Sequence, residues 1–307
     1  MQKPILFFVF LLCFTCAHAQ DSTAQVNVVS DHRYDMALRR NQVKALAMLR
    51  KEDTTLASPY WPHVKPALFF ANLRQNILYP QYINQGKSTN FCGYAAMTHL
   101  LLRYHPDIYL QQILALYHNG EARLKKRTLK PSERVRKAAG MLKNKGELDM
   151  LHANQLWFLT LADQFKGYMN FVDHKFNMGD ENKIWAGTNY GKFNRMLTHF
   201  TDDQISSRGS DLSRPKIRDL SGHASGELKK GVVLLFVNSK YLYPHKYSLF
   251  KLRAPTHFIV LYDLYPVGDM LEMQYWDYGL RTEQQISQKR LRDLIYGITT
   301  ITHISDE

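Results

Sequence analysis

The apolar residues of this chain change their spacing at Gly231, and that change sets the order of its secondary structure. Before Gly231, apolar side chains recur every three or four residues, as in amphipathic helices. After it come two β-branched apolar runs, Val232–Val237 and His257–Tyr262, and an alternating run, Met270–Trp276. Such runs indicate strands. We therefore expect an α+β fold in which a helical N-terminal part packs on a C-terminal antiparallel sheet.

The helical periodicity can be followed segment by segment. Helices are expected over 31–50, 66–76, 92–104, 108–118, 131–143, 152–165 and 190–200. A short helix near 287–296 should precede a last strand at 299–303. The rest of 180–210 is polar and is expected to be loop.

Residues 1–19 have the pattern of a secretory signal peptide. Lys3 supplies the positive start, an apolar stretch runs from Ile5 to Cys16, and Ala17-His-Ala19 is a small-x-small cleavage sequence. The apolar stretch is too short to span a bilayer as a helix. We therefore expect an exported protein that is secreted or periplasmic.

The chain that remains after cleavage would keep 288 residues, which is 307 minus 19. That length can bury a sizeable core as one large domain. We expect a helical arm at 20–65 and a single domain at 66–307, within which 107–225 forms a helical insert.

Cys92 is the only cysteine that the mature chain would retain, because Cys13 and Cys16 lie in the signal sequence. A lone cysteine cannot form an intramolecular disulfide. Cys92 is followed by Gly93 and opens a helical apolar pattern. Unpaired amide hydrogens and the macrodipole at a helix N-terminus favour a thiolate. A buried structural cysteine is the alternative, but this position predicts a nucleophile.

The positive charge is concentrated in one part of the chain. The formal net charge is +13 and would be +12 without Lys3, with the excess between Arg123 and Lys145. No aromatic residue, zinc-ligand spacing or Gly-rich phosphate loop accompanies that stretch, so we expect no specific nucleic acid, no metal and no cofactor. The basic insert would face an anionic cell surface, although ordinary solubilising charge explains the pattern equally well.

His257 is the candidate for the base that a cysteine nucleophile requires. It opens a buried strand directly after Pro255-Thr256, so the sheet would hold its ring. His99 shares the helix of Cys92, but seven residues of rise separate them by roughly 10 Å, which assigns His99 to the core or the surface. Other histidines lie farther along that helix, in a flexible loop, or without a partner nearby: His105, His223, His199 and His245.

Asp277 is the candidate partner of His257. The turn between their strands contains Pro266 and Gly268, and a turn centred near Val267 would set His257 opposite Asp277. Opposed residues share a sheet face with Cβ atoms roughly 5 Å apart, where a carboxylate can fix the tautomer of an imidazole. Taken singly, His257 fits a core histidine and Asp277 a turn residue. Together with a cysteine at a helix start, they predict catalysis.

An acyl-transfer site also needs donors for the developing oxyanion. The backbone amide of Cys92 is one candidate. A side-chain amide upstream should be the other, and Gln85 lies seven residues before the cysteine. Asn84 and Asn90 are alternatives, and loop capping is an equally good role for any of the three.

These motifs resemble the papain-like cysteine peptidase superfamily, and most closely the branch that contains the bacteriocin-leader peptidases. The resemblance rests on Gln85 with Asn90-Phe-Cys92-Gly-Tyr-Ala-Ala-Met, on Thr256-His257-Phe-Ile-Val-Leu-Tyr262 and on Tyr275-Trp-Asp277-Tyr-Gly279. It implies a papain-like fold with Cys92 as nucleophile, His257 as base, Asp277 as its orienter and Gln85 as oxyanion donor.

The resemblance covers 78–104 and 231–301, and the stretch 107–225 has no counterpart in it. Tyr94 stands where the family usually has proline after the Cys-Gly pair, and the Gln–Cys spacing is one residue longer than usual.

The expected function is that of an exported cysteine hydrolase, a thiol protease or amidase that cleaves a peptide or amide bond through an acyl-enzyme on Cys92. Its substrate would be a peptide, a protein or peptidoglycan. Acyl transfer of the transglutaminase type, or glutamine deamidation, would use the same residues. The alternative from another class is a non-catalytic binding protein on a papain-like scaffold.

Overall fold

The computed structural model describes residues 35–86, 89–142, 150–166, 175–243 and 255–302, and the side chains of all of these except 35–39. The expected signal peptide, 1–19, and the first part of the expected arm, 20–34, lie outside the described residues, as does His245.

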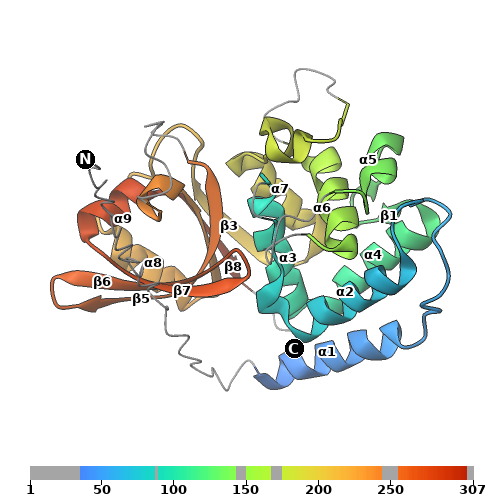
Figure 1. The fold of residues 1–307 in the computed structure, drawn as a ribbon. Coiled ribbons are helices and arrows are strands. Elements are labelled where there is room, and N and C mark those ends of the chain that lie inside the picture. The colour runs from blue at the N-terminus through green and yellow to red at the C-terminus, as the bar shows by residue number, and fades with distance from the viewer. Residues whose placement is uncertain (1–34, 87–88, 143–149, 167–174, 244–254, 303–307) are drawn as a thin grey trace, which may run out of the picture.

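The first half of the described chain is mainly helical, and its helices lie together beside the sheet (Figure 1). They are α1 (Asp35–Leu49), α2 (Pro66–Leu78), α3 (Cys92–Tyr104), α4 (Pro106–Asn119), α5 (Glu133–Ala138), α6 (His152–Phe165) and α7 (Tyr190–Phe200). These bounds lie close to the expected ones except for α5, which ends before 143. Cys92 is the first residue of α3, as its motif predicts.

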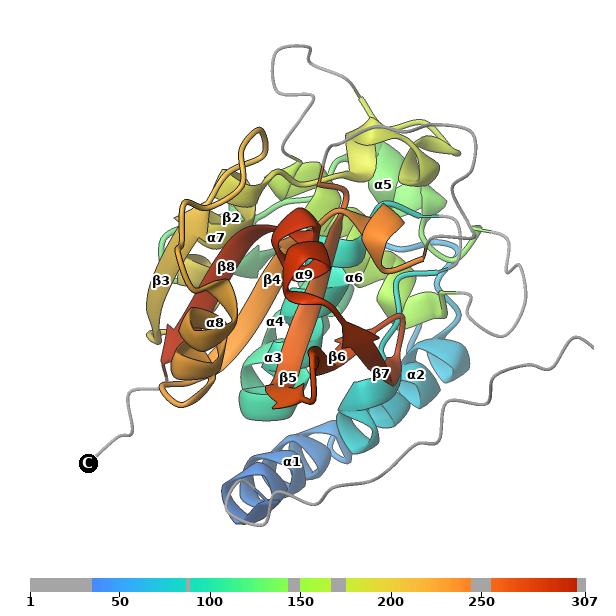
Figure 2. The same cartoon turned by 90° about the vertical axis from the view of Figure 1, so that its left-hand side faces the viewer.

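A six-stranded antiparallel sheet forms the second half, with strand order β3-β8-β4-β5-β6-β7. Its strands are β3 (Gln204–Gly209), β4 (Val232–Val237), β5 (His257–Val267), β6 (Met270–Asp277), β7 (Leu280–Ile286) and β8 (Ile295–Thr302). Two helices, α8 (Leu220–Leu228) and α9 (Gln288–Leu294), cover the face turned away from α3 (Figures 1 and 2). The fold is therefore α+β, as expected.

Both faces of the central strands are buried, which explains their continuous apolar runs. Side chains alternate between the faces of a strand. Leu234 and Phe236 of β4 belong to the larger core, shared with the helices of the N-terminal half. Val233 and Leu235 belong to a second core, shared with α8 and α9.

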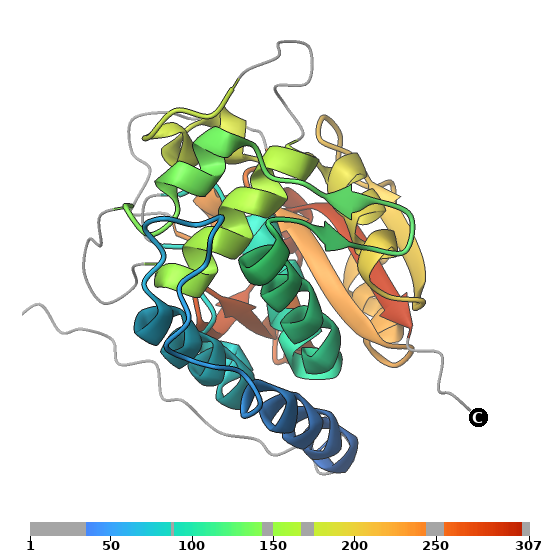
Figure 3. The same cartoon turned by 90° about the vertical axis from the view of Figure 1, so that its right-hand side faces the viewer.

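The segment 107–225, expected as a helical insert, also contains strands. A two-stranded hairpin of β1 (Ala122–Arg123) and β2 (Thr128–Leu129) lies beside α4 (Figure 3). Strand β3 pairs along β8 at one edge of the sheet. Its sequence, Gln-Ile-Ser-Ser-Arg-Gly, lacks an apolar pattern because an edge strand pairs on one side only and is mostly exposed here. Helices α4, α6 and α7 share the core of α3, so this segment is part of one structure.

The basic stretch surrounds the β1–β2 hairpin. Arg123, Lys125, Lys126 and Arg127 line a hollow of about 900 Å³ beside the end of α4. Part of this charge is already paired, since Lys125 forms an ion pair with Asp202 and Arg127 lies over the ring of Phe165. Among the described residues, no helix is long and apolar enough to cross a membrane.

The aromatic stack at the centre of the sheet offers a test of the fold. Phe236 stacks on Phe258 and on Tyr190, with ring centroids 4.4 Å and 5.6 Å apart. We expect Phe236→Ala to lower the free energy of unfolding by about 3–5 kcal/mol, because it leaves a cavity between the sheet and α7. Urea denaturation followed by circular dichroism measures this change.

Leu212→Ala is the matched control, since the Leu212 side chain is 94% exposed. Its free energy of unfolding should stay within about 0.5 kcal/mol of the wild type. Equal effects of the two substitutions would contradict the described core.

Candidate active site

Cys92 lies where the start of α3 meets the start of β5. Its side chain is 9% exposed, and its Sγ lies 3.7 Å from the carbonyl oxygen of Thr256. Thr256 directly precedes His257, the first residue of β5. The contact therefore joins two motifs whose residues lie 164 positions apart in the sequence.

Gly93 permits this close approach. A Cβ atom on Gly93 would lie 2.7 Å from Cγ2 of Thr188 and 3.2 Å from Cδ2 of Phe258. Both distances are shorter than ordinary contacts, so a larger residue would force the side chains of Thr188 and Phe258 to move. The Cys-Gly pair thus has a packing reason as well as a chemical one.

His257 connects Cys92 with Asp277. Nε2 of His257 lies 2.6 Å from Oδ1 of Asp277, and both side chains are buried. Because a carboxylate can only accept, Nε2 carries the proton that it donates. The side chain of Cys92 also acts on the ring and raises the pKa of His257, and Nδ1 is the ring nitrogen that Asp277 leaves free. The structure therefore brings the three expected catalytic residues together.

The surroundings of His257 favour its charged form. Burial alone would lower its pKa, but the charge of Asp277, the hydrogen bond to Asp277 and the neighbouring side chain of Cys92 raise the pKa well above the ordinary value of 6.5. The charged imidazolium is therefore more favoured here than in an ordinary histidine. A cation beside a cysteine favours its thiolate form.

Asp277 has a second partner that sequence reasoning missed. The hydroxyl of Tyr243 donates to Oδ2, the carboxylate oxygen that His257 does not use. Burial and the nearby charge of Asp277 raise the pKa of Tyr243, so its hydroxyl keeps the proton. Both carboxylate oxygens are thus fixed. Tyr243 stands in an irregular segment, where no periodicity or motif draws attention to it.

Tyr278 is a second missed residue, and it lies beside the ring of His257. The two rings stack with centroids 5.1 Å apart and an interplanar angle of 20°. Tyr278 has a φ of 47°, which is unusual for a residue other than glycine. This backbone conformation turns the chain directly after Asp277 and places the ring over the imidazole. In the sequence, only its position next to Asp277 could have pointed to Tyr278.

The β5–β6 register from which Asp277 was predicted is wrong, although His257 and Asp277 do form the predicted pair. Strands β5 and β6 pair Val267 with Met270, so the turn is centred between Gly268 and Asp269 and not at Val267. After a shift in the ladder, Val260 pairs with Trp276. Continued by one residue, this register sets Asp277 opposite Ile259.

His257 is therefore a diagonal neighbour of Asp277 and not its direct partner. It lies two residues from Ile259 on the same face of the sheet. Diagonal neighbours are roughly 7–8 Å apart, a little less between their Cβ atoms, and long side chains span that distance. The imidazole and the carboxylate cover that separation.

Gln85 stays available as an oxyanion donor. It is 2% exposed in the loop before α3, and no hydrogen bond joins its side chain to another described residue. Its two competitors have structural roles. Asn84 accepts from the amide of Gly86 at 2.7 Å, and Asn90 donates to the carbonyl of Lys183 at 2.8 Å.

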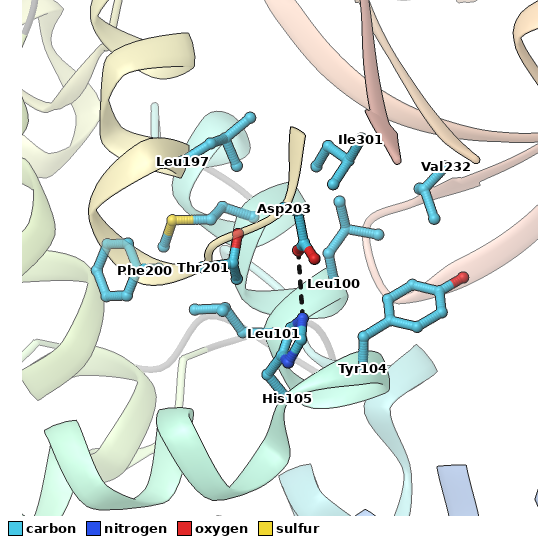
Figure 4. A pocket seen from close by; sticks show the side chains of 11 residues that line it. Leu100, Leu101, Tyr104, His105, Leu197, Phe200, Thr201, Asp203, Val232 and Ile301 are labelled. Carbon is cyan, nitrogen blue, oxygen red and sulfur yellow. Dashed lines mark hydrogen bonds and ion pairs between the residues drawn. The ribbon is translucent and has the colours of Figure 1, made fainter. Parts of the chain in front are cut away.

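His105, set aside as a base on the sequence, lies at the opposite end of α3. It pairs with Asp203 at 3.2 Å beside an apolar pocket lined by Leu100, Leu101 and Ile301 (Figure 4). His105 lies thirteen residues and roughly 20 Å along α3 from Cys92, so its pair with Asp203 takes no part in the site. In the described residues, no group of three or more His, Cys, Asp or Glu side chains could hold a metal ion.

Comparisons of the chain with protein families, curated proteins and solved structures found no match. A function for this chain is therefore inferred from the geometry and chemistry of the site.

The pairing of Cys92 with His257 predicts an unusual pH dependence of alkylation. An ordinary thiol reacts with iodoacetamide about a hundred times more slowly at about pH 6 than at about pH 8. We expect the rate at Cys92 to fall by less than about tenfold over this range, because the raised pKa of His257 keeps a cation beside the sulfur.

His257→Ala is the control, and its alkylation should follow the steep profile of an ordinary thiol. Mass spectrometry of the modified protein over time gives both rates. A wild-type profile as steep as that of His257→Ala would show that the two side chains do not act together.

Proposed function

We propose that this chain is a cysteine hydrolase that cleaves a peptide or amide bond through an acyl-enzyme on Cys92. One observation carries the proposal. Asp277 holds the buried ring of His257 through a hydrogen bond, and the free thiol of Cys92, at the start of a helix, acts on the same ring. A nucleophile, a base and a group that orients the base are what acyl transfer requires.

In the first half of the reaction, the Cys92 thiolate attacks the carbonyl carbon and a C–S bond forms. The carbonyl oxygen gains negative charge as the tetrahedral intermediate develops. His257 donates its Nδ1 proton to the leaving nitrogen, the C–N bond breaks, and an amine departs. A thioester on Cys92 remains.

In the second half, water replaces the amine. His257, now neutral, removes a proton from the water as the water oxygen attacks the thioester. The C–S bond then breaks, the carboxylic acid leaves, and the thiolate–imidazolium pair is restored. Asp277 accepts from Nε2 throughout and keeps Nδ1 directed at the sulfur.

Two donors would stabilise the oxyanion. The amide of Cys92 is in the first turn of α3, where backbone N–H groups have no acceptor within the helix. The side-chain amide of Gln85 has no described partner and precedes the same helix start. Fixed donors of this kind stabilise the charge that develops in the transition state.

A papain-like architecture fits the order of these elements. The cysteine starts a helix, the histidine starts a strand, and the acid ends the next strand along the chain. His257 would use Nδ1 toward the nucleophile and Nε2 toward its orienting group. Within that superfamily, the motifs favour the branch of the bacteriocin-leader peptidases.

The proposed setting is outside the cell or in the periplasm. The signal-peptide pattern of 1–19 supports export. Peptides, proteins and peptidoglycan are the proposed substrates. The basic hollow beside the β1–β2 hairpin would hold the enzyme near anionic cell surfaces.

The function is tested by incubating wild type and Cys92→Ala with purified peptidoglycan and with a protein mixture. Mass spectrometry of the products should show new cleavage ends with the wild type only. Amine adducts would indicate acyl transfer instead, and glutamine-to-glutamate conversion would indicate deamidation. Identical products from both proteins would contradict any of these activities.

Once a substrate is identified, the size of the effect on kcat should distinguish the roles of these residues. We expect Asp277→Asn to lower kcat by about a thousandfold or more, because the imidazole loses its orientation. Gln85→Ala should cost about a hundredfold, the usual effect of losing one oxyanion donor. Asn84→Ala is the matched control, because its side chain caps a turn in the same loop, and it should leave kcat within about threefold.

A further inference from the structure

His99 lies on the same side of α3 as Cys92, two helical turns later. It is 1% exposed, and both of its ring nitrogens are bonded. Nδ1 lies 3.0 Å from the carbonyl oxygen of Pro80 and Nε2 lies 2.8 Å from the hydroxyl of Tyr262. A carbonyl only accepts, so Nδ1 carries the proton and Nε2 accepts from Tyr262.

Tyr262 is the extra residue of the bulge between β5 and β6. Leu261 pairs with Tyr275 and Asp263 pairs with Gln274, which leaves Tyr262 without an opposite residue. An unpaired residue of this kind bends its strand and can redirect a side chain. Here its hydroxyl is tied to α3 through His99.

Trp276, on the strand opposite the bulge, is held by the same histidine. The rings of Trp276 and His99 stack with centroids 4.6 Å apart and an interplanar angle of 5°. Nε1 of Trp276 also donates to the carbonyl oxygen of Gln81 at 2.8 Å. Trp276 directly precedes Asp277, so His99 contacts both strands where the register shifts.

The bulge decides on which face of the sheet Asp277 lies. Without it, the register near the turn would continue and set Asp277 opposite Val260. Val260 is three residues from His257, so their side chains point to opposite faces. With the bulge, Asp277 comes opposite Ile259, on the face of His257. A shift by one residue would therefore separate the base from its orienting group.

We propose that His99 and Tyr262 are positioning residues of the active site: they fasten the β5–β6 bulge to α3 and so keep Asp277 on the face of His257. This inference rests on the proposed function. Helix α3 then has two roles. Its first residue, Cys92, is the nucleophile, and His99, two turns later, holds the bulge that positions Asp277.

The hydrogen bond between His99 and Tyr262 does not change its protonation at the near-neutral pH where the proposed site would act. Burial, together with the charge of Arg103, lowers the pKa of His99 to about 3 against the opposing effect of its bond to Pro80. The guanidinium groups of Arg103 and Arg281 lie 5.5 Å and 5.4 Å from the ring centroid of Tyr262, and no carboxylate of a described residue bonds to His99. A change in pH profile near neutrality would therefore report on His257 and not on His99.

The test uses Tyr262→Phe, which removes one hydroxyl and keeps the ring. The measurement is the rate of Cys92 alkylation by iodoacetamide from about pH 6 to about pH 9, at a temperature where circular dichroism shows each protein folded. If Asp277 leaves His257, the imidazolium loses its partner, and the rate at about pH 6 should fall about tenfold with little change at about pH 9. His99→Phe keeps a ring on Trp276, loses both bonds, and should give the same change.

Tyr109→Phe is the matched control. Tyr109 is also buried, and its hydroxyl accepts from Asn76 within the helical part. Its loss should lower stability by a similar amount and leave the alkylation profile unchanged. The inference is overturned if Tyr262→Phe and His99→Phe keep the wild-type profile, or if Tyr109→Phe shifts it as strongly. A wild-type profile already as steep as that of His257→Ala would instead overturn the proposed function.

Discussion

The packing of α3 against β5 is the contact on which the site depends. One face of β5 presents Phe258 and Val260 to the larger core, and α3 lies on that face with a glycine at the tightest point. The thiol at the start of the helix then meets the imidazole at the start of the strand. Neither group has a partner of this kind within its own segment. The pair exists because two apolar surfaces fit closely.

Much of the fold could be predicted from apolar spacing. The periodicity of the N-terminal half located its helices, and the buried runs located β4, β5 and β6, because those elements bury whole faces. Strands β3 and β7 did not appear in the pattern. They form the two edges of the sheet, where side chains are largely exposed and the pairing partner, not the side chains, defines the strand.

The site could be predicted as a set of residues but not as a geometry. Cys92, His257 and Asp277 stand in motifs of recognisable chemistry, whereas the bulge at Tyr262 leaves no mark in the sequence. Tyr243 reaches Asp277 from an irregular segment, and His99 acts through contacts with a loop and two strands. Each of these depends on the tertiary arrangement. The correct pair emerged from an incorrect register because, past the bulge, the observed register differs from the expected one by two residues, which leaves Asp277 on the face of His257.

The spacing of Cys92 and His99 on α3 has a consequence for how such a chain can vary in length. Seven residues make nearly two full turns, so both side chains project from the same side of the helix. One residue inserted or deleted between them would rotate one side chain relative to the other by about 100°. Cys92 and His99 could then not both contact their partners in the sheet. This stretch of helix could not change in length at all, because even a whole heptad would move His99 roughly 10 Å along the axis and away from Tyr262 and Trp276.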